Sequence, residues 1–361
     1  MSGEVVARRL RAQRLAGNPL PGAAEVVGWM GAVQAQDYGA AKWALAQRAG
    51  GVTDDLVDRL VDEGAILRTH VMRSTWHFVL PADVRWMVGL TRAGRGRSSA
   101  SRFRELELDE PTVERASLVF RAALTGGRHL TRPELGVALE AAGISARGQR
   151  LPHLLICAET DAVIVSGPRR GREFTYALLD ERVPAGPELE RPAALAELAR
   201  RYFRSHGPAR VRDFAWWSGL AAADARAAVE RAGIPGRTPA DGGDPWLDAE
   251  WEPVRARRRP PLAHLLPNFD EYTVAYRDRE ALVHPEHPLE PGLLSFGSVL
   301  ANVVTVDGLV RGAWRRARAR RAVQVDVRPF GWLEAPEAAA VAEAGRRLGV
   351  FLGCPVEMEG L

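Results

Sequence analysis

Residues 66–80 read ILRTHVMRSTWHFVL, and this stretch decides among the folds open to the chain. Before it, the apolar residues recur at helical spacing, and Thr53 with two following aspartates is a plausible start for the last of several helices. Within 66–80 the period changes to two, as in a pair of short strands. Several helices followed by a short β-hairpin are typical of a winged helix. The sequence therefore predicts a winged-helix unit in this region.

Similar patterns follow further along the chain. Thr131 and Glu134 predict a capping box after a helix over 112–124, and a strand, basic turn and strand follow over 163–178. A third set of helices begins near Pro192, and from about Pro260 the sequence pattern predicts mainly strands. We therefore predict an α+β protein made of tandem winged helix-turn-helix modules. The expected boundaries are residues 1–108, 109–188 and 189–259 for three modules and 260–361 for a β-rich C-terminal α+β unit.

Composition narrows the class of protein. The chain has 361 residues, 46% of them hydrophobic, which is ordinary for globular proteins and excludes a disordered or fibrous chain. No apolar run approaches the roughly 20 residues needed to span a bilayer, and the first residues lack the apolar core of a signal peptide. Cys157 and Cys354 are far apart and indicate neither a disulfide framework nor a zinc site. We expect a cytoplasmic monomer without membrane association, metal or cofactor.

The basic residues are distributed unevenly, although 49 basic and 45 acidic residues give a net charge of only +4. Lys42 is the only lysine. This preference for arginine over lysine is explained as well by a GC-rich genome as by a nucleic-acid partner. Acid-free arginine clusters favour a polyanionic partner, because phosphate contacts release condensed counterions, although each cluster also fits a solvated loop. The arginines expected to bind DNA are Arg95, Arg97, Arg169, Arg170, Arg257, Arg258, Arg315 and Arg316.

Conventional catalytic motifs are absent: the sequence has no Walker loop, dinucleotide fingerprint, HExxH or nucleophile elbow. The unusual stretch is Gln34-Ala35-Gln36-Asp37, where two amides and a carboxylate follow an apolar helix. A carboxamide is no strong base, but it can donate and accept hydrogen bonds and so hold a water molecule. A glutamine pair at this place fits the end of a helix equally well. His70 and His77 flank the hairpin, and we expect them to face the same groove.

Five segments, in order along the chain, carry a resemblance to a known family: VQAQDYGAAKWAL, LRTHVMRSTWHFV, HGPARVRDFAWWSGL, LLPNFDEYTVAYRDR and VVTVDGLVRGAWRR. They are similar to winged-helix DNA glycosylases of the AlkZ and YcaQ type. That family is built from tandem winged-helix motifs around a basic concave surface, so the resemblance implies a C-shaped DNA cradle. Its AlkZ branch has a glutamine, an apolar residue and a second glutamine as its catalytic motif. Gln34, Ala35 and Gln36 match this form.

The resemblance implies a monofunctional glycosylase that removes N7-alkylated guanine from double-stranded DNA, including bulky or crosslinked natural-product adducts. Both general repair and self-resistance occur among such proteins. Gln34 and Gln36 would position the attacking water, whereas Asp37 either stabilises charge or caps a helix. The first wing, over 69–75, would bring His70 and Arg73 near the lesion, with His77 beside them. No lysine is placed to form a Schiff base with the sugar, so no lyase step is expected.

A non-enzymatic reading remains open, in which the chain is a winged-helix DNA-binding protein or transcriptional regulator. Such a regulator normally has a dimer helix and a recognition helix rich in arginine and amides. The sequence offers no heptad repeat and no obvious dimer helix. A plain scaffold would leave the arginine clusters unexplained.

Overall fold

The computed structural model describes residues 2–186, 189–239, 242–250, 260–284, 302–318 and 322–361. Its element order repeats three times as helix, strand, helix, helix, strand, strand. In each copy the strand that is first in sequence pairs antiparallel with the third, which also pairs with the second. The repeat confirms the recurring element order expected from the sequence, whereas the module boundaries themselves stay a prediction.

The first copy consists of α2 (Ala23–Met30), β1 (Val33–Gln34), α3 (Tyr38–Ala46), α4 (Asp54–Glu63), β2 (Leu67–Val71) and β3 (Thr75–Val79). The second consists of α6 (Glu110–Leu124), β4 (Leu130–Thr131), α7 (Arg132–Ala141), α8 (Arg150–Thr160), β5 (Ile164–Ser166) and β6 (Thr175–Leu178). The third has α10 (Arg191–His206), an isolated bridge at Ala209, α11 (Val211–Ser218), α12 (Ala222–Ala232), β7 (Gly236–Arg237) and β8 (Trp246–Leu247).

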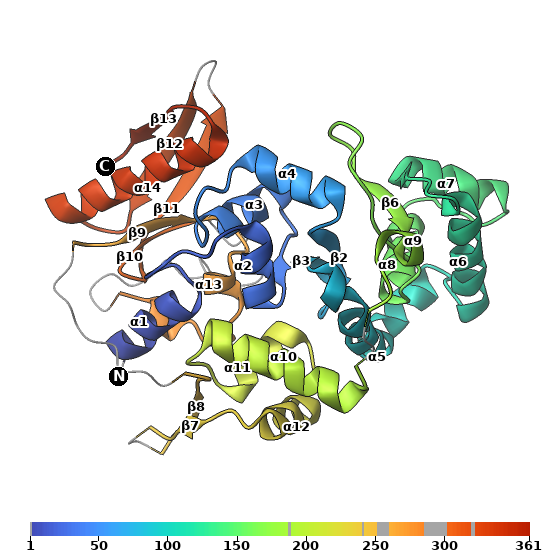
Figure 1. Cartoon of the computed structure of the whole chain (residues 1–361), viewed down its shortest axis with the longest axis horizontal. Helices are drawn as coiled ribbons and strands as arrows, with labels where there is room; N and C mark the ends of the chain where they lie inside the picture. The colour runs from blue at the N-terminus through green and yellow to red at the C-terminus, as the bar shows by residue number, and fades with distance from the viewer. Residues whose placement is uncertain (1, 187–188, 240–241, 251–259, 285–301, 319–321) are drawn as a thin grey trace.

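The C-terminal unit is a curled five-stranded sheet in the order β13-β12-β11-β10-β9. Its elements are β9 (Ala263–Leu266), α13 (Glu271–Val274), a 3-10 turn (Glu280–Leu282), β10 (Val303–Val306), β11 (Leu309–Arg318), β12 (Val323–Pro329), α14 (Ala335–Leu352) and β13 (Val356–Glu359). This sheet and the second copy lie at opposite ends of the molecule, and the first copy lies between them (Figure 1). The overall class is therefore α+β. No described helix is both long and apolar enough to cross a membrane.

Local sequence signals explain where several helices begin. The Thr53 side chain accepts a hydrogen bond from the Leu56 backbone N–H at the start of α4. Thr131 and Glu134 form the predicted capping box of α7. Such caps satisfy N–H groups that have no partner inside the helix. By contrast, α5 (Pro81–Glu105) was not predicted, although Pro81 occupies its first turn. Arg95 and Arg97 lie in this helix, but their side chains are outside the described part of the structure.

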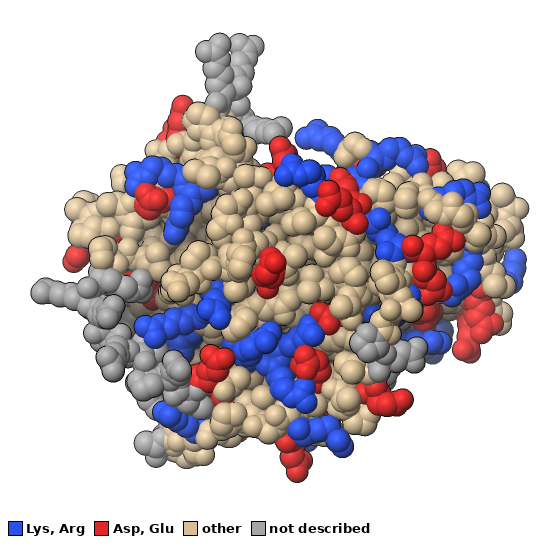
Figure 2. Space-filling view, in the orientation of Figure 1, with Lys and Arg blue, Asp and Glu red and all other residues tan. Residues whose placement is uncertain are grey.

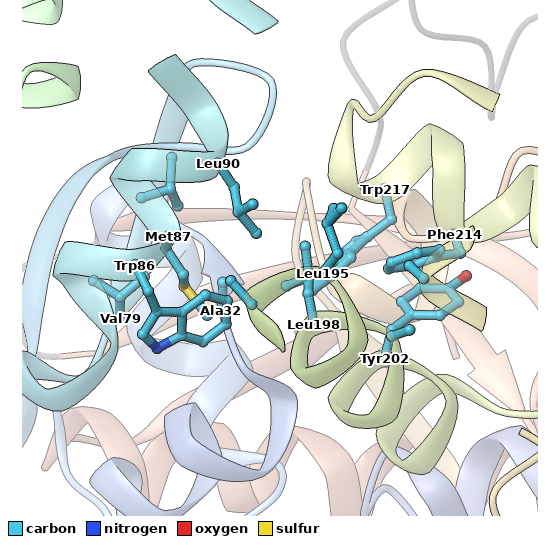
Figure 3. Packing of buried hydrophobic residues seen from close by; sticks show 14 of the residues in the cluster. Ala32, Val79, Trp86, Met87, Leu90, Leu195, Leu198, Tyr202, Phe214 and Trp217 are labelled. Carbon is cyan, nitrogen blue, oxygen red and sulfur yellow. The ribbon is translucent and has the colours of Figure 1, made fainter. Parts of the chain in front are cut away.

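The largest core cluster joins the first copy to the third (Figure 3). Trp86 and Met87 of α5 face Leu195 and Leu198 of α10, and Trp217 of α11 extends the same layer. Side chains from the hairpin β2–β3 and from the segment after α13 complete the cluster. Because a close-packed core transmits displacement, the hairpin and α13 are held in fixed relative positions.

A buried ion pair ties the first copy to the C-terminal unit. Arg48, just beyond α3, donates two hydrogen bonds to the carboxylate of Asp270, at 2.7 and 2.9 Å. Neither side chain is more than 2% exposed. Asp270 also caps α13 by accepting the backbone N–H of Tyr272. A bidentate pair in this setting fixes geometry as well as charge.

We expect Asp270→Ala to lower the free energy of unfolding by about 3–5 kcal/mol, because it leaves the Arg48 guanidinium buried without its counterion. Equilibrium urea denaturation measures this loss. The matched control is Asp326→Ala, which removes the exposed pair between Arg315 and Asp326 and should cost less than about 1 kcal/mol. Equal losses for the two variants would contradict the role given to the buried pair.

Candidate functional site

Gln34 ends β1, the first strand of the first copy, and Ala35 and Gln36 lie in the short link between this strand and α3. Gln34 is opposite His77 in the β1–β3 register, and the backbone N–H of Ala35 donates to the carbonyl of Trp76 at 2.7 Å. Ala35 is buried in the core of the first copy, whereas neither glutamine belongs to that core cluster. Gln34 is 3% exposed and Gln36 lies at the surface. The end of the strand and the link after it therefore carry one enclosed amide and one open amide, two residues apart.

Gln34 is held by two charged side chains from distant parts of the sequence. Its backbone N–H donates to Oε1 of Glu271 at 2.7 Å. Its side-chain oxygen accepts a hydrogen bond from Nη2 of Arg73, in the turn between β2 and β3, at 3.2 Å. Gln36 is held less tightly, since its amide oxygen lies 3.5 Å from the backbone N–H of Trp76.

Glu271 is a fully buried carboxylate at the junction of three structural units. Besides Gln34, it accepts a hydrogen bond from the indole N–H of Trp217 at 3.0 Å, and Nε2 of His206 lies 3.4 Å from it. Burial raises the pKa of Glu271, but the neighbouring His206 and His77 and the hydrogen bond from the Gln34 backbone outweigh this and place the pKa below its ordinary value. The site thus contains a fixed negative charge. Sequence reasoning missed Glu271, although it lies within the segment LLPNFDEYTVAYRDR.

The two histidines of the hairpin face opposite sides of it, so the expectation that they share a groove is wrong. In the β2–β3 register His77 is opposite Thr69, whereas His70 is opposite Trp76, one position further along. A shift of one residue along a strand reverses the face of the side chain. His77 joins Gln34 on one face. On the other, Nδ1 of His70 lies 2.6 Å from the Glu159 carboxylate of α8.

His77 is completely buried, and burial lowers its pKa to about 4. Its Nδ1 donates to the carbonyl of Thr75 at 2.8 Å, and its Nε2 is buried with no hydrogen-bond partner among the described residues. The ring is therefore neutral at pH 7, with a lone pair on Nε2.

Asp37 caps a helix, which was one of the two alternatives open from sequence. Its side chain accepts the backbone N–H of Ala40 at 3.0 Å, at the first turn of α3. A guanidinium approaches the same turn, since a Cβ built on Gly39 would lie 3.4 Å from Nη2 of Arg316. An accessory chemical role for Asp37 stays a prediction.

Several arginines expected to bind DNA have acidic partners brought in by the fold. Arg169 is paired with Asp58 and Asp62 of α4, and Arg170 with Glu134. Arg315 is 84% exposed and paired with Asp326. Figure 2 shows basic and acidic side chains interspersed over the face it presents. Arginines that form acid-free clusters in the sequence are thus partly paired with acidic side chains in the folded structure.

Arg316 differs from its neighbour Arg315. It is exposed, and no ion pair joins it to another residue in the part of the chain that the structure describes. Arg257 and Arg258 lie outside the described residues. For all eight arginines, contact with DNA stays a prediction.

Comparisons with known proteins agree over nearly the whole chain. The family model described as DNA glycosylase AlkZ-like matches residues 27–351. An interstrand DNA cross-link repair glycosylase of Streptomyces sahachiroi is 26% identical over 328 residues, which cover 86% of each chain. The solved structure of Streptomyces sahachiroi DNA glycosylase AlkZ matches with a TM-score of 0.81 and 24% identity, covering 99% of this chain and 98% of that one. This structural likeness shows that the two chains share the same overall fold.

The depressed pKa of His77 predicts a loss of stability in acid. Between about pH 6.5 and pH 4 the unfolded chain protonates this histidine and the folded chain does not, so stability falls as the pH is lowered through this range. The contribution is about 2 kcal/mol between pH 7.5 and pH 5. Urea denaturation at both pH values should show a smaller drop for His77→Asn than for the native chain. An identical drop would show that His77 titrates normally in the folded protein.

Proposed function

The chain belongs to the AlkZ-like DNA glycosylase family, and we propose that it hydrolyses the N-glycosidic bond of N7-alkylguanine in double-stranded DNA. The observation that carries this proposal is the pair of amides where β1 ends, with Gln34 enclosed and Gln36 open. Neither amide is an acid or a strong base, so the site suits a leaving group that needs no protonation.

N7-alkylguanine provides such a leaving group because the base already carries a positive charge. In the reaction the C1′–N9 bond breaks and its electron pair neutralises the departing base. A water oxygen forms the new bond to C1′, and one water proton passes to solvent. The sugar becomes oxocarbenium-like on the way, so a fixed negative charge near it is favourable. The ionised Glu271, which holds the backbone of Gln34, supports this electrostatic role.

The reaction stops at the abasic site, in our proposal. A lyase step needs an amine that can form a Schiff base with the sugar. Lys42, the only lysine, is 5% exposed, and its Nζ lies 2.8 Å from carboxylate oxygens of both Asp54 and Asp58. Held in this way, the amine is enclosed by carboxylates and is not free to approach the sugar.

The substrate class that we propose includes bulky and crosslinked adducts, in repair or in self-resistance. A relative from Streptomyces sahachiroi is an interstrand DNA cross-link repair glycosylase. The exposure of Gln36 supports the extension to this chain, because a crosslinked base cannot be flipped into a closed pocket. The repeated units of the fold would act as winged-helix modules of a C-shaped, monomeric cradle, with arginines contacting phosphates.

The catalytic assignment predicts that Gln34→Ala and Gln36→Ala each lower release of N7-methylguanine by about 100-fold or more, measured above spontaneous depurination in single-turnover assays. Binding to intact duplex should change less than about threefold, since neither amide is charged. Gln149→Ala, an exposed glutamine before α8, is the control and should keep native activity.

Native release by the double variant Gln34→Ala/Gln36→Ala, with duplex binding intact, would rule out the catalytic assignment. Duplex binding without release of any N7-alkylated base by the native chain would favour the non-enzymatic DNA-binding alternative. A panel of N7-methyl, bulky and crosslinked duplexes would define the adduct.

Arg316 should contact a phosphate more readily than Arg169, which is already occupied by two aspartates. We expect Arg316→Ala to reduce the slope of log K against log salt by about 0.9, the contribution of one phosphate contact on duplex DNA. Arg169→Ala should leave the slope unchanged. Fluorescence anisotropy over a salt series measures both, and equal slopes for native chain and Arg316→Ala would exclude the contact.

A further inference from the structure

The hydrogen bond between Arg73 and Gln34 fixes which end of the Gln34 amide is available. The side-chain oxygen points to the guanidinium, with Nη2 to Oε1 at 3.2 Å. The amide nitrogen makes no hydrogen bond to any residue that the structure describes. We propose that Arg73 is a positioning residue that turns the Gln34 carboxamide so that its NH2 group, and not its oxygen, faces the attacking water. This inference rests on the proposed function.

Arg73 can act in this way because its own position is fixed by α11. Its Nη1 donates to the carbonyls of Trp216 and Trp217, at 2.8 and 2.7 Å, in the last turn of that helix. Cations are favoured there because the carbonyl end of a helix is negative. The guanidinium therefore bridges two units, with one nitrogen on the third copy and the other on Gln34.

Gly219 makes room for this bridge. It ends α11 with a φ of 74°, and a Cβ at this position would lie 3.0 Å from Cγ of Arg73 and 3.4 Å from its backbone nitrogen. The turn that carries Arg73 is also constrained, since Met72 and Ser74 on either side have φ values of 57° and 55°. Non-glycine residues rarely adopt these values, so the surrounding packing must hold the turn.

The arrangement has a chemical consequence. A guanidinium on Oε1 withdraws electron density from the amide and makes its N–H groups better donors. A water that accepts such an N–H keeps a second lone pair for attack on C1′. The positive charge of Arg73 would repel a cationic base, but the ionised Glu271 on the backbone of Gln34 offsets it.

A double-mutant cycle tests this coupling, using Arg73→Lys, Gln34→Ala and the combination. An ammonium group lacks the planar fork that reaches both α11 and Gln34. We expect Arg73→Lys to lower single-turnover release of N7-methylguanine by about 10- to 100-fold, with duplex affinity unchanged. In the Gln34→Ala background, Arg73→Lys should have no further effect, because the amide it orients is gone.

The chain offers a matched control in Arg182. Its Nη2 donates to the carbonyls of Val61 and Asp62 in the last turn of α4, and Gly64 ends that helix with a φ of 83° beside its guanidinium. Arg182→Lys therefore removes the same kind of helix-end contact without touching Gln34. Its release rate should stay native.

The outcomes separate the two proposals. Absence of N7-methylguanine release by the native chain refutes the proposed function. Native release by Gln34→Ala refutes the catalytic assignment of Gln34 and, with it, the role of Arg73. If Gln34→Ala is slow and the losses of release rate from the two single substitutions multiply in the double variant, the role of Arg73 is refuted and the proposed function stands. If Arg73→Lys fails to fold, Gln34→Glu decides: it can still pair with Arg73 but has no N–H to donate. Loss of release by folded Gln34→Glu supports the orientation, and native release overturns it.

Discussion

The ionised carboxylate of Glu271 is buried away from water, and several elements of the structure contribute groups that stabilise it there. Burying a carboxylate is costly unless hydrogen bonds and opposite charge replace its hydration. The replacements come from Gln34 in the first copy and from Trp217 and His206 in the third. Gln34 and Trp217 donate hydrogen bonds and His206 lies close by, and each is on a different element, so the position of the carboxylate depends on correct packing of all three. The same packing sets the backbone of Gln34.

Local features of the fold could be predicted because their causes are local. The Thr131–Glu134 capping box is visible in four residues, and the Asp307–Gly308 turn is a strong two-residue hairpin signal. In the structure both turn residues have positive φ, as that turn requires. The long helix α5 escaped prediction because its second half is rich in glycine and serine, which are poor helix formers. Its amphipathic contacts with α10 come from tertiary packing.

The site was only half predictable for the same reason. Gln34 and Gln36 are visible as a motif, but Glu271 is 237 residues from Gln34, and nothing nearby in sequence marks the contact. The facing of His70 and His77 depends on a register that sequence leaves open. The arginine clusters show the limit most clearly. Arg169 lies in an acid-free stretch, yet its partner Asp62 comes from 107 residues earlier in the chain.

The three copies differ at the link between their first strand and the helix that follows. In the second copy Thr131 ends β4 and is itself the cap of α7, and in the third Arg210 caps α11 directly after the bridge at Ala209. In the first copy Ala35 and Gln36 separate β1 from the cap, Asp37. Among the three copies, only the first therefore has two residues of chain between its strand and the helix cap, and one of them, Gln36, lies at the surface. Where the strand passes directly into the cap, as in the other two copies, no side chain can occupy the corresponding place.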